Sequence, residues 1–232
     1  MGIIITIDGP AGAGKSTVAG ELAKRLGFHY INTGDLYRYI TYCALKEKLN
    51  VNNSQTMQKL SFEIVEKYLQ GYCNNATNLV SHLKSITDKI HSPEVDKKVS
   101  FVAEHSSVRK NLIPLQRLLA KNNSVVMEGR DIGTVIIPYA DLKFFITADE
   151  HTRIMRRYLE QLEKGYKISF AEVKKEIINR DHIDSKRKTA PLIKPDGAIL
   201  VDTSNKTVDE VITEMLDWVK SIKRDRYGNN KS

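Results

Sequence analysis

The sequence predicts an α/β fold in which a central parallel sheet lies between layers of helices. Three observations lead to this prediction. Short runs of β-branched and apolar residues alternate with longer stretches of helical periodicity. The first apolar run, 3–8, ends in a glycine-rich loop that a helix-forming stretch follows at once. The chain of 232 residues is long enough to bury the core of one such domain.

The expected elements follow from two periodicities. Short apolar runs bounded by glycine, proline or polar residues indicate buried strands. Apolar residues at every third or fourth position indicate helices, as with Val18, Leu22 and Leu26 before Gly27. Strands are expected at 3–8, 28–31, 124–127, 142–147 and 199–202. Helices are expected at 16–26, 35–49, 56–69, 93–117 (in one or two pieces), 150–163, 169–188 and 207–223.

Two long stretches do not fit a simple alternation of strand and helix. The stretch from about 34 to 105 is too long for one crossover, and we interpret it as an insertion into the core. Within it, the polar, asparagine-rich segment 71–92 is expected to be irregular, with short strands. The charged helices of 150–188 are interpreted as a second, mobile projection. The core then comprises about 1–33, 106–149 and 189–223, and residues 224–232 are expected to form a flexible tail.

Composition narrows the class of protein. Hydrophobic residues make up 41% and charged residues 28%, as in a soluble globular protein, and we recognise neither a signal peptide nor a membrane span. Cys43 and Cys73 stand alone, which indicates neither a metal site nor a disulfide and predicts a cytoplasmic protein. The formal charge of +8 fits either a nucleic-acid binder or an enzyme of polyphosphate substrates.

The glycine-rich loop has the pattern G-x-x-x-x-G-K-S between an expected strand and an expected helix. Its glycines allow the backbone to approach phosphate oxygens, and backbone amides at the helix start bind the anion. Lys15 is expected to reach the β- and γ-phosphates, and the Ser16 hydroxyl to ligate Mg²⁺. The triphosphate-binding residues predicted here are Gly9, Pro10, Ala11, Gly12, Ala13, Gly14, Lys15, Ser16 and Thr17.

Three further clusters of polar residues lie at 32–38, 128–134 and 180–187. Arg130 and Asp131 follow a central strand, and ligands of open parallel sheets bind beyond the carboxyl ends of strands. Arg180, Asp184 and Arg187 have the spacing of one helical face. Each cluster alone also fits an exposed charge or a local ion pair. Their combination with a phosphate loop favours a substrate site.

Further motifs extend along nearly the whole chain: T-G-D-L-Y-R, S-P-E-V-D-K-K-V-S-F-V-A, V-R-K-N-L-I-P-L-Q-R, G-R-D-I-G-T, R-R-Y-L-E-Q-L-E-K-G and R-D-H-I-D-S-K-R-K-T-A-P-L. With the glycine-rich loop they resemble the bacterial cytidylate kinase family. The loop is shared by many kinases, whereas the combination of G-R-D-I-G-T with R-D-x-x-D-S-x-R-x-x-A-P-L is far more specific. The resemblance implies a three-layer P-loop kinase fold with a nucleoside monophosphate (NMP)-binding insertion at 34–105 and a helical lid at 150–188. It also implies that ATP, with Mg²⁺, phosphorylates CMP or dCMP, and that the enzyme is a monomer that binds neither nucleic acid nor membrane.

The resemblance also assigns roles to residues. Arg38, Arg130 and Arg187 are expected to hold the acceptor phosphate and, with Lys15, to form the catalytic set. Arg153 and Arg157 are expected to cover the ATP phosphates from the lid, together with Arg156. The remaining residues of the acceptor pocket are expected to be Thr33, Tyr37, Ser100, Arg109, Asp131, Arg180 and Asp184.

The chemistry of the residues supports these roles separately. A monophosphate is already an anion, so its attacking oxygen needs charge neutralisation and alignment rather than a general base. Arginine binds phosphate bidentately and keeps its charge. For the base, Asp131 can accept from the amino group of cytosine, and Arg109 and Ser100 can donate to its ring nitrogen and carbonyl. The span 151–188 holds 11 Lys/Arg against six acids, so a basic lid explains much of the charge without nucleic acid.

The chain departs from the family pattern at four positions, which carry Asn32, Asp35, Glu128 and His91. None of these changes removes an arginine assigned to phosphate.

Two other functions compete with this interpretation. An adenylate kinase explains T-G-D-L-Y-R but leaves G-R-D-I-G-T and A-P-L unexplained. A GTPase-like regulator or a nucleic-acid binder lacks support, because the chain has no N-K-x-D motif and no basic patch interleaved with aromatic residues.

Overall fold

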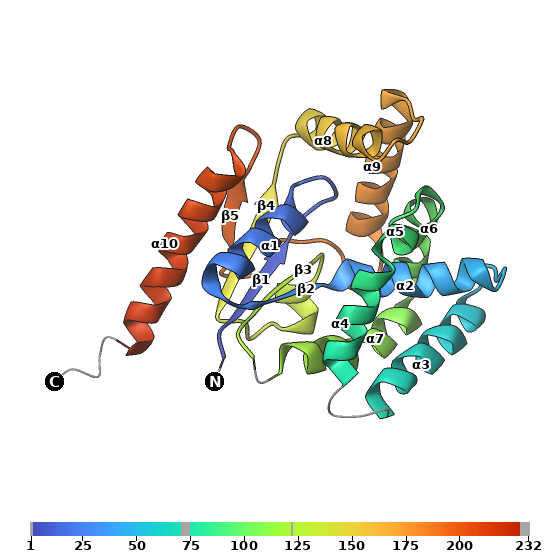
Figure 1. Cartoon of the computed structure of the whole chain (residues 1–232), viewed down its shortest axis with the longest axis horizontal. Helices are drawn as coiled ribbons and strands as arrows, with labels where there is room; N and C mark the ends of the chain where they lie inside the picture. The colour runs from blue at the N-terminus through green and yellow to red at the C-terminus, as the bar shows by residue number, and fades with distance from the viewer. Residues whose placement is uncertain (1, 71–74, 122, 228–232) are drawn as a thin grey trace.

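A computed structural model describes residues 2–70, 75–121 and 123–227, and it confirms the α/β fold (Figure 1). The sheet contains β1 (Ile4–Asp8), β2 (His29–Asn32), β3 (Val125–Gly129), β4 (Leu142–Thr147) and β5 (Ile199–Asp202). The strand order is β2-β3-β1-β4-β5, and every adjacent pair is parallel. Because all strands point the same way, the loops that follow them gather at one edge of the sheet.

Helices cover both faces of this sheet and extend well beyond it. In chain order they are α1 (Lys15–Leu26), α2 (Thr33–Lys46), α3 (Ser54–Gln70), α4 (Asn75–Ser85), α5 (Thr87–Ile90), α6 (Pro93–Glu104), α7 (Ser106–Ala120), η1 (Ile132–Ile136), α8 (Glu150–Glu163), α9 (Phe170–Lys186) and α10 (Val208–Tyr227). The expected helix 93–117 is divided at His105, whose backbone is extended and which lies between α6 and α7. The expected tail 224–232 is helical up to Tyr227, and 228–232 lie outside the described residues.

The prediction for 71–92 is wrong in its described part, because helices α4 and α5 occupy it in place of irregular chain with short strands. Leu79 and Leu83 of α4 are buried, as is Ile90 at the end of α5. With Ile86, which packs against the same core, their spacings of four, three and four residues put all four on one side of the chain. Polar residues between these positions obscured the helical period. Residues 71–74 are not among those described.

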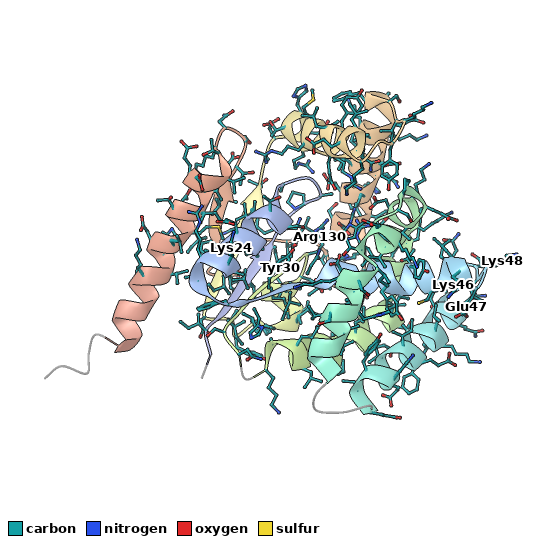
Figure 2. The ribbon with its side chains drawn as sticks, viewed as in Figure 1. Lys24, Tyr30, Lys46, Glu47, Lys48 and Arg130 are labelled. Carbon is teal, nitrogen blue, oxygen red and sulfur yellow. The ribbon has the colours of Figure 1, made fainter. Side chains whose placement is uncertain are left out.

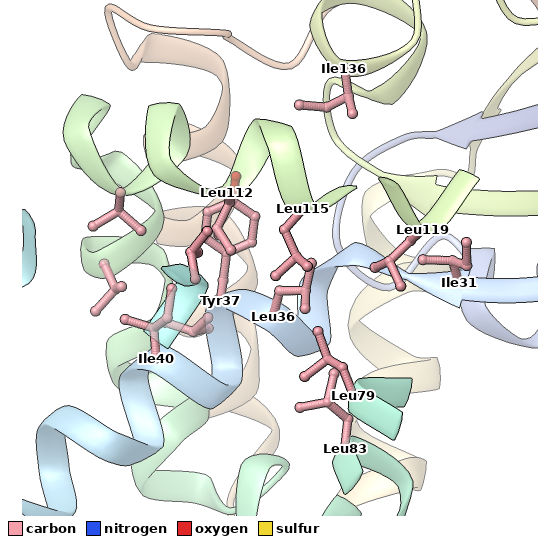
Figure 3. Close-up of a cluster of buried hydrophobic side chains, with 14 of the residues drawn as sticks. Ile31, Leu36, Tyr37, Ile40, Leu79, Leu83, Leu112, Leu115, Leu119 and Ile136 are labelled. Atoms are coloured by element: carbon pink, nitrogen blue, oxygen red, sulfur yellow. The ribbon is translucent and has the colours of Figure 1, made fainter. Parts of the chain in front are cut away.

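Two large apolar cores lie on opposite faces of the sheet. Val126 of β3 packs with α1 and α10, whereas its neighbours Val125 and Met127 pack with α2, α4 and α7. This alternation follows from the period of two in a strand. The second core brings together Leu36, Tyr37 and Ile40 of α2, Leu79 and Leu83 of α4, and Leu112, Leu115 and Leu119 of α7 (Figure 3).

A small third core joins α8 and α9. Ile154, Val173 and Ile177 are buried there together with Ala11 of the glycine-rich loop. Figure 1 shows this helix pair standing above the end of the sheet, with α9 descending toward α5 and α6. None of the helices in the described ranges combines the length and apolar character needed to cross a bilayer.

Candidate active site

A cavity of about 840 Å³ opens at the carboxyl edge of the sheet, between the glycine-rich loop, α2, α6, α7 and the α8–α9 pair. Every predicted site residue lines this cavity except Gly9, Pro10 and Arg153. Figure 2 shows Arg130 and Tyr30 near the centre of the molecule, whereas Lys46, Glu47 and Lys48 lie at its edge. The cavity therefore brings together residues from segments that are far apart in the sequence.

The glycine-rich loop links the end of β1 to the start of α1. Gly12 and Gly14 have φ of 75° and 84°, a left-handed conformation that side chains disfavour. A Cβ at Gly12 would also lie 2.7 Å from the carbonyl oxygen of Arg153. No side chain caps α1, so the first amides of the helix can bind an anion.

Lys15 is the charged side chain of this loop. It is buried, and its Nζ donates to the carbonyl oxygen of Pro10 at 2.7 Å. Burial lowers the pKa of Lys15 well below its ordinary value, and nearby Arg130 lowers it further. Among the described residues no carboxylate forms an ion pair with Lys15. An anion bound in the loop would supply the missing partner.

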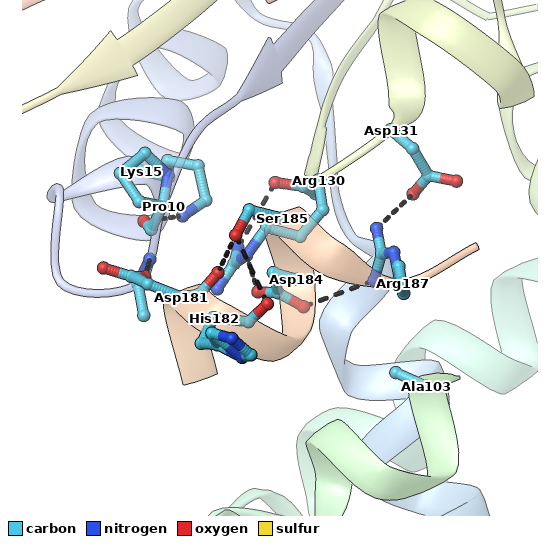
Figure 4. Close-up of polar contacts among 12 residues, drawn as sticks. Pro10, Lys15, Ala103, Arg130, Asp131, Asp181, His182, Asp184, Ser185 and Arg187 are labelled. Carbon is cyan, nitrogen blue, oxygen red and sulfur yellow. Dashed lines mark hydrogen bonds and ion pairs between the residues drawn. The ribbon is translucent and has the colours of Figure 1, made fainter. Parts of the chain in front are cut away.

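Arginines and carboxylates alternate across one side of the cavity (Figure 4). Arg130 Nε lies 2.9 Å from Asp184, and Asp184 lies 3.2 Å from Arg187 Nη1. Arg187 Nη2 lies 3.9 Å from Asp131, which also pairs with Arg109. We call this row of five ion-paired side chains the acceptor chain, because all five were expected in the acceptor pocket. It joins β3, α7 and α9 around one end of the cavity.

Asp184 of the acceptor chain stays ionised despite burial. Burial alone would raise the pKa of Asp184, but Arg130, Arg180 and Arg187 outweigh it and hold this pKa below the usual value. Arg187 lies just past the end of α9, in extended backbone, so only Arg180 and Asp184 share the helical face expected for all three. Burial and the neighbouring Arg130 lower the pKa of Arg180 to about 10. Arg180 lines the cavity, and no group of the described residues accepts a hydrogen bond from its guanidinium, which leaves it for a ligand.

Residues expected to contact the base lie beside the acceptor chain. The guanidinium of Arg109 lies 5.3 Å from the centre of the Tyr37 ring and donates to the carbonyl oxygen of Ala103 at 3.1 Å. Ser100 is buried and lines the cavity. Thr33 donates to the carbonyl oxygen of Glu128 at 2.8 Å, which fixes the start of α2 against the end of β3.

The four departures from the family pattern all lie near the carboxyl end of β2. Asn32 Nδ2 lies 3.0 Å from Asp35 Oδ1, which lies 2.9 Å from His91 Nε2. Glu128 accepts a short hydrogen bond from the hydroxyl of Tyr30. Three of the four departures therefore contact one another, and they join α2 to the end of α5.

Two arginines of α8 occupy different positions. Arg153 is buried and donates to the carbonyl oxygens of Ala148 and Ala11 at 3.1 and 3.0 Å, and it pairs with Asp181. It therefore supports the back of the glycine-rich loop, and its expected contact with ATP stays a prediction. Arg157 lines the cavity, where it pairs with Asp96 and Glu160.

Sequence reasoning missed several residues of the site. Thr203 and Lys206 line the cavity just beyond β5, and Arg156 donates to the Thr203 hydroxyl and carbonyl oxygens at 2.9 and 2.6 Å. Their place after a strand was the available signal, because ligands of parallel sheets bind there. Asp8 was also missed. Its carboxylate accepts from the amides of Ile132 and Gly133, both at 2.8 Å, and so holds the turn after β3 against β1.

Comparison with known proteins places the chain among nucleotide kinases. Residues 5–221 match the family model described as cytidylate kinase. The cytidylate kinase of Alkaliphilus metalliredigens (strain QYMF) is 42% identical over 91% of this chain and 94% of its own length. That of Shouchella clausii (strain KSM-K16) is 44% identical over 96% and 98%. In structure, a gluconokinase from Sinorhizobium meliloti 1021 matches with a TM-score of 0.50 at 13% identity, covering 99% of this chain and 97% of that one.

Proposed function

Because the chain belongs to the cytidylate kinase family, we propose that it transfers the γ-phosphate of ATP to CMP or dCMP. The observation that carries this proposal is the acceptor chain, which opens onto the same cavity as the glycine-rich loop. One end of the cavity suits a triphosphate. The other end combines arginines for a second phosphate with Asp131 for a base.

The donor side is proposed to bind ATP through the glycine-rich loop. Backbone amides of the loop and of the start of α1 would bind the phosphates, and Lys15 would reach the γ-phosphate. The hydroxyl of Ser16, at the first turn of α1, faces the cavity and is a hard oxygen ligand of the kind Mg²⁺ prefers. Bound Mg²⁺ would neutralise charge on the phosphates, and ADP would leave when the bond between its β-phosphate and the γ-phosphorus breaks.

The acceptor side is proposed to align the monophosphate for in-line attack. An oxygen of the CMP phosphate forms a bond to the γ-phosphorus, and CDP results. This oxygen carries charge already, so the pocket needs no general base. Arg38, Arg130 and Arg187 would reduce repulsion between the two polyanions and hold the attacking oxygen in place.

We propose that the pocket selects the base by the hydrogen-bonding groups along the edge of its ring. Asp131 accepts hydrogen bonds only, which fits the amino group of cytosine and disfavours the carbonyl oxygen of uracil. Arg109 holds Asp131 in place and stacks on Tyr37, so a base entering here meets a rigid polar edge. Arg180 and Asp184 are proposed to serve the ribose side.

We assign α8 and α9 as a lid and the segment 34–105 as the acceptor-binding insertion. The lid contacts the glycine-rich loop through the small core around Ala11 and through Arg153. Closure of such a lid would exclude water and limit wasteful hydrolysis of ATP. We further expect the enzyme to act as a monomer in the cytoplasm, without a nucleic-acid or membrane partner.

A coupled assay of ADP formation tests the proposed function. The purified chain, with ATP and Mg²⁺, is supplied separately with CMP, dCMP, UMP and AMP. We expect CMP and dCMP to give the highest kcat/KM and AMP to give the lowest. Absence of ADP formation with every acceptor would contradict the kinase assignment, and preference for AMP would favour an adenylate kinase instead.

A further inference from the structure

One carboxylate outside the predicted site joins its two sides. Asp96, in the first turn of α6, has Oδ1 2.6 Å from Nη1 of Arg38 on α2. Its other oxygen, Oδ2, pairs with Nη2 of Arg157 on α8. Both arginines line the cavity, whereas Asp96 is not among the lining residues. Asp96 therefore supports the two arginines from behind.

The contacts of Arg38 leave part of its guanidinium free. Nη1 meets both Asp96 and the carbonyl oxygen of Ile90, the latter at 3.3 Å. The described residues offer no hydrogen bond to Nε or Nη2, which remain for a ligand. Arg157 is fixed on two sides, by Asp96 and by Glu160. One carboxylate thus sets the direction of an arginine in each half of the cavity.

Asp96 is ionised in this position. Its side chain is only 7% exposed, and burial alone would raise its pKa. Arg38, Arg157 and Arg180 outweigh burial and hold this pKa below the usual value. Side chains of both charges lie near Asp96, because Lys97 and Glu176 are close to it as well. The carboxylate is therefore an anion that two helices outside α6 share.

We propose that Asp96 is a positioning residue that couples the acceptor site to the lid. The proposal rests on the proposed function, which places Arg38 at the acceptor phosphate and Arg157 over the ATP phosphates. An acceptor that orders Arg38 also fixes Asp96, and Asp96 then favours the position of α8 in which Arg157 reaches the cavity. CMP should therefore tighten the binding of ATP, and ATP should tighten the binding of CMP by the same factor.

Calorimetric titration of the full chain measures this factor. The Kd of CMP is determined with and without a saturating, non-hydrolysable ATP analogue, and the Kd of the analogue with and without CMP. For the unmodified chain we expect a coupling of about 10-fold, within the usual range for linked sites. In Asp96→Asn, which keeps the shape and removes the charge, we expect less than about 3-fold. Glu94→Gln is the matched control, because exposed Glu94 lies in the same turn of α6, and it should retain the full coupling.

Two further measurements separate coupling from stability. A purely structural role for Asp96 would weaken both ligands and lower the melting temperature of Asp96→Asn while the coupling factor stayed at its original value. That result would overturn the proposal. If Asp96→Asn does not fold, Arg157→Gln removes the lid end of the same contact and should lose the coupling to the same extent. Retained coupling in Arg157→Gln would also overturn it.

The outcomes distinguish this inference from the proposed function. A chain that forms ADP with CMP but keeps its coupling in Asp96→Asn contradicts the role of Asp96 alone. A chain that forms no ADP with CMP contradicts the proposed function, and the role of Asp96 with it. Where coupling is lost in both single variants, the double variant Asp96→Asn/Arg157→Gln should lose no more, because both substitutions break one contact.

Discussion

The glycine-rich loop offers mainly backbone to its ligand, whereas the acceptor chain offers side chains from separate elements. The loop is one continuous segment whose shape depends on Gly12 and Gly14. The acceptor chain depends on α7, the turn after β3, and α9 with the residue that follows it. One short segment is enough to form a loop of this kind, but the acceptor chain forms only once the whole domain has folded.

The two regions also differ in electrostatic balance. Lys15 is a buried cation without a carboxylate partner in the described chain, and burial lowers its pKa. Arg187 is equally buried but lies between Asp131 and Asp184. The glycine-rich loop therefore holds a cation without a direct ion-pair partner, although the nearby carboxylates of Glu128 and Asp184 favour its charge. Arg187, in contrast, has direct carboxylate partners before a ligand arrives. Substitutions in the two regions should consequently affect activity and stability in different proportions.

Replacement of Lys15 should give the largest loss of activity. In Lys15→Met we expect kcat to fall about 1,000-fold, because a buried charge that stabilises the transferred phosphate is lost. The free energy of unfolding should stay unchanged or rise, since an apolar side chain replaces a buried amine that forms no direct ion pair. Steady-state kinetics and urea unfolding measure the two effects. Lys24→Met, on the exposed part of the same helix, is the control and should change neither.

Replacement of Arg187 should combine a smaller kinetic loss with a loss of stability. Arg187→Met should lower kcat/KM for CMP about 100-fold, which corresponds to the loss of one buried charge contact. It should also lower the free energy of unfolding by roughly 3 kcal/mol, because Asp131 and Asp184 lose a shared partner that is only 1% exposed. Exposed Lys188→Met serves as the control. Equal stability of Arg187→Met and the unmodified chain would contradict the contrast between the two regions.

Replacement of Asp131 should alter selectivity more than rate. Asp131→Asn can donate to the carbonyl oxygen of uracil, so the ratio of kcat/KM for CMP to that for UMP should fall about 10-fold. Parallel assays with both acceptors measure this ratio, and exposed Asp196→Asn should leave it as it was. An unchanged ratio in Asp131→Asn would show that other groups select the base.

The contrast between the regions also explains which parts of the site were predictable. The glycine-rich loop is contiguous, so its spacing alone indicates a phosphate site. Arg130, Asp131 and Arg187 lie in distinctive short motifs, and the structure places them together in the acceptor chain. Asp8 lies in an ordinary strand, and Asp96 lies in the motif S-P-E-V-D-K-K-V-S-F-V-A, in which only Ser100 was expected to contact the substrate. Their roles depend on partners more than 50 residues away, which local spacing does not indicate.

The fold, too, could be predicted only where the local sequence pattern was clear. The strands and most helices followed from periodicity to within a few residues, because burial imposes a period of two or 3.6 on each. Helix α4 did not, since polar residues interrupt its apolar positions Leu79 and Leu83. Arg153 illustrates the limit for function. The family resemblance implies a contact of Arg153 with ATP, which stays a prediction, and the direction of its side chain, toward Ala11, depends on how α8 packs on the loop.

The smallest predicted effect concerns Asp8 at the end of β1, the strand that leads into the glycine-rich loop. Asp8 connects the two regions because it holds the turn after β3 against this strand. Burial raises the pKa of Asp8 to about 6, although the amides of Ile132 and Gly133 oppose this shift. At pH values between the ordinary aspartate pKa of 3.8 and about 6, the folded chain therefore holds a proton that the unfolded chain has released. The stability from this group falls as pH rises through this range. Between pH 5 and pH 7 the loss should be about 1 kcal/mol. Urea unfolding of the unmodified chain and of Asp8→Asn at both pH values measures it, since the difference between the two chains removes the contributions of all other groups. A difference in unfolding free energy that is the same at pH 5 and pH 7, or that grows in favour of the unmodified chain at pH 7, would show that Asp8 is ionised throughout and that its two amide contacts outweigh its burial.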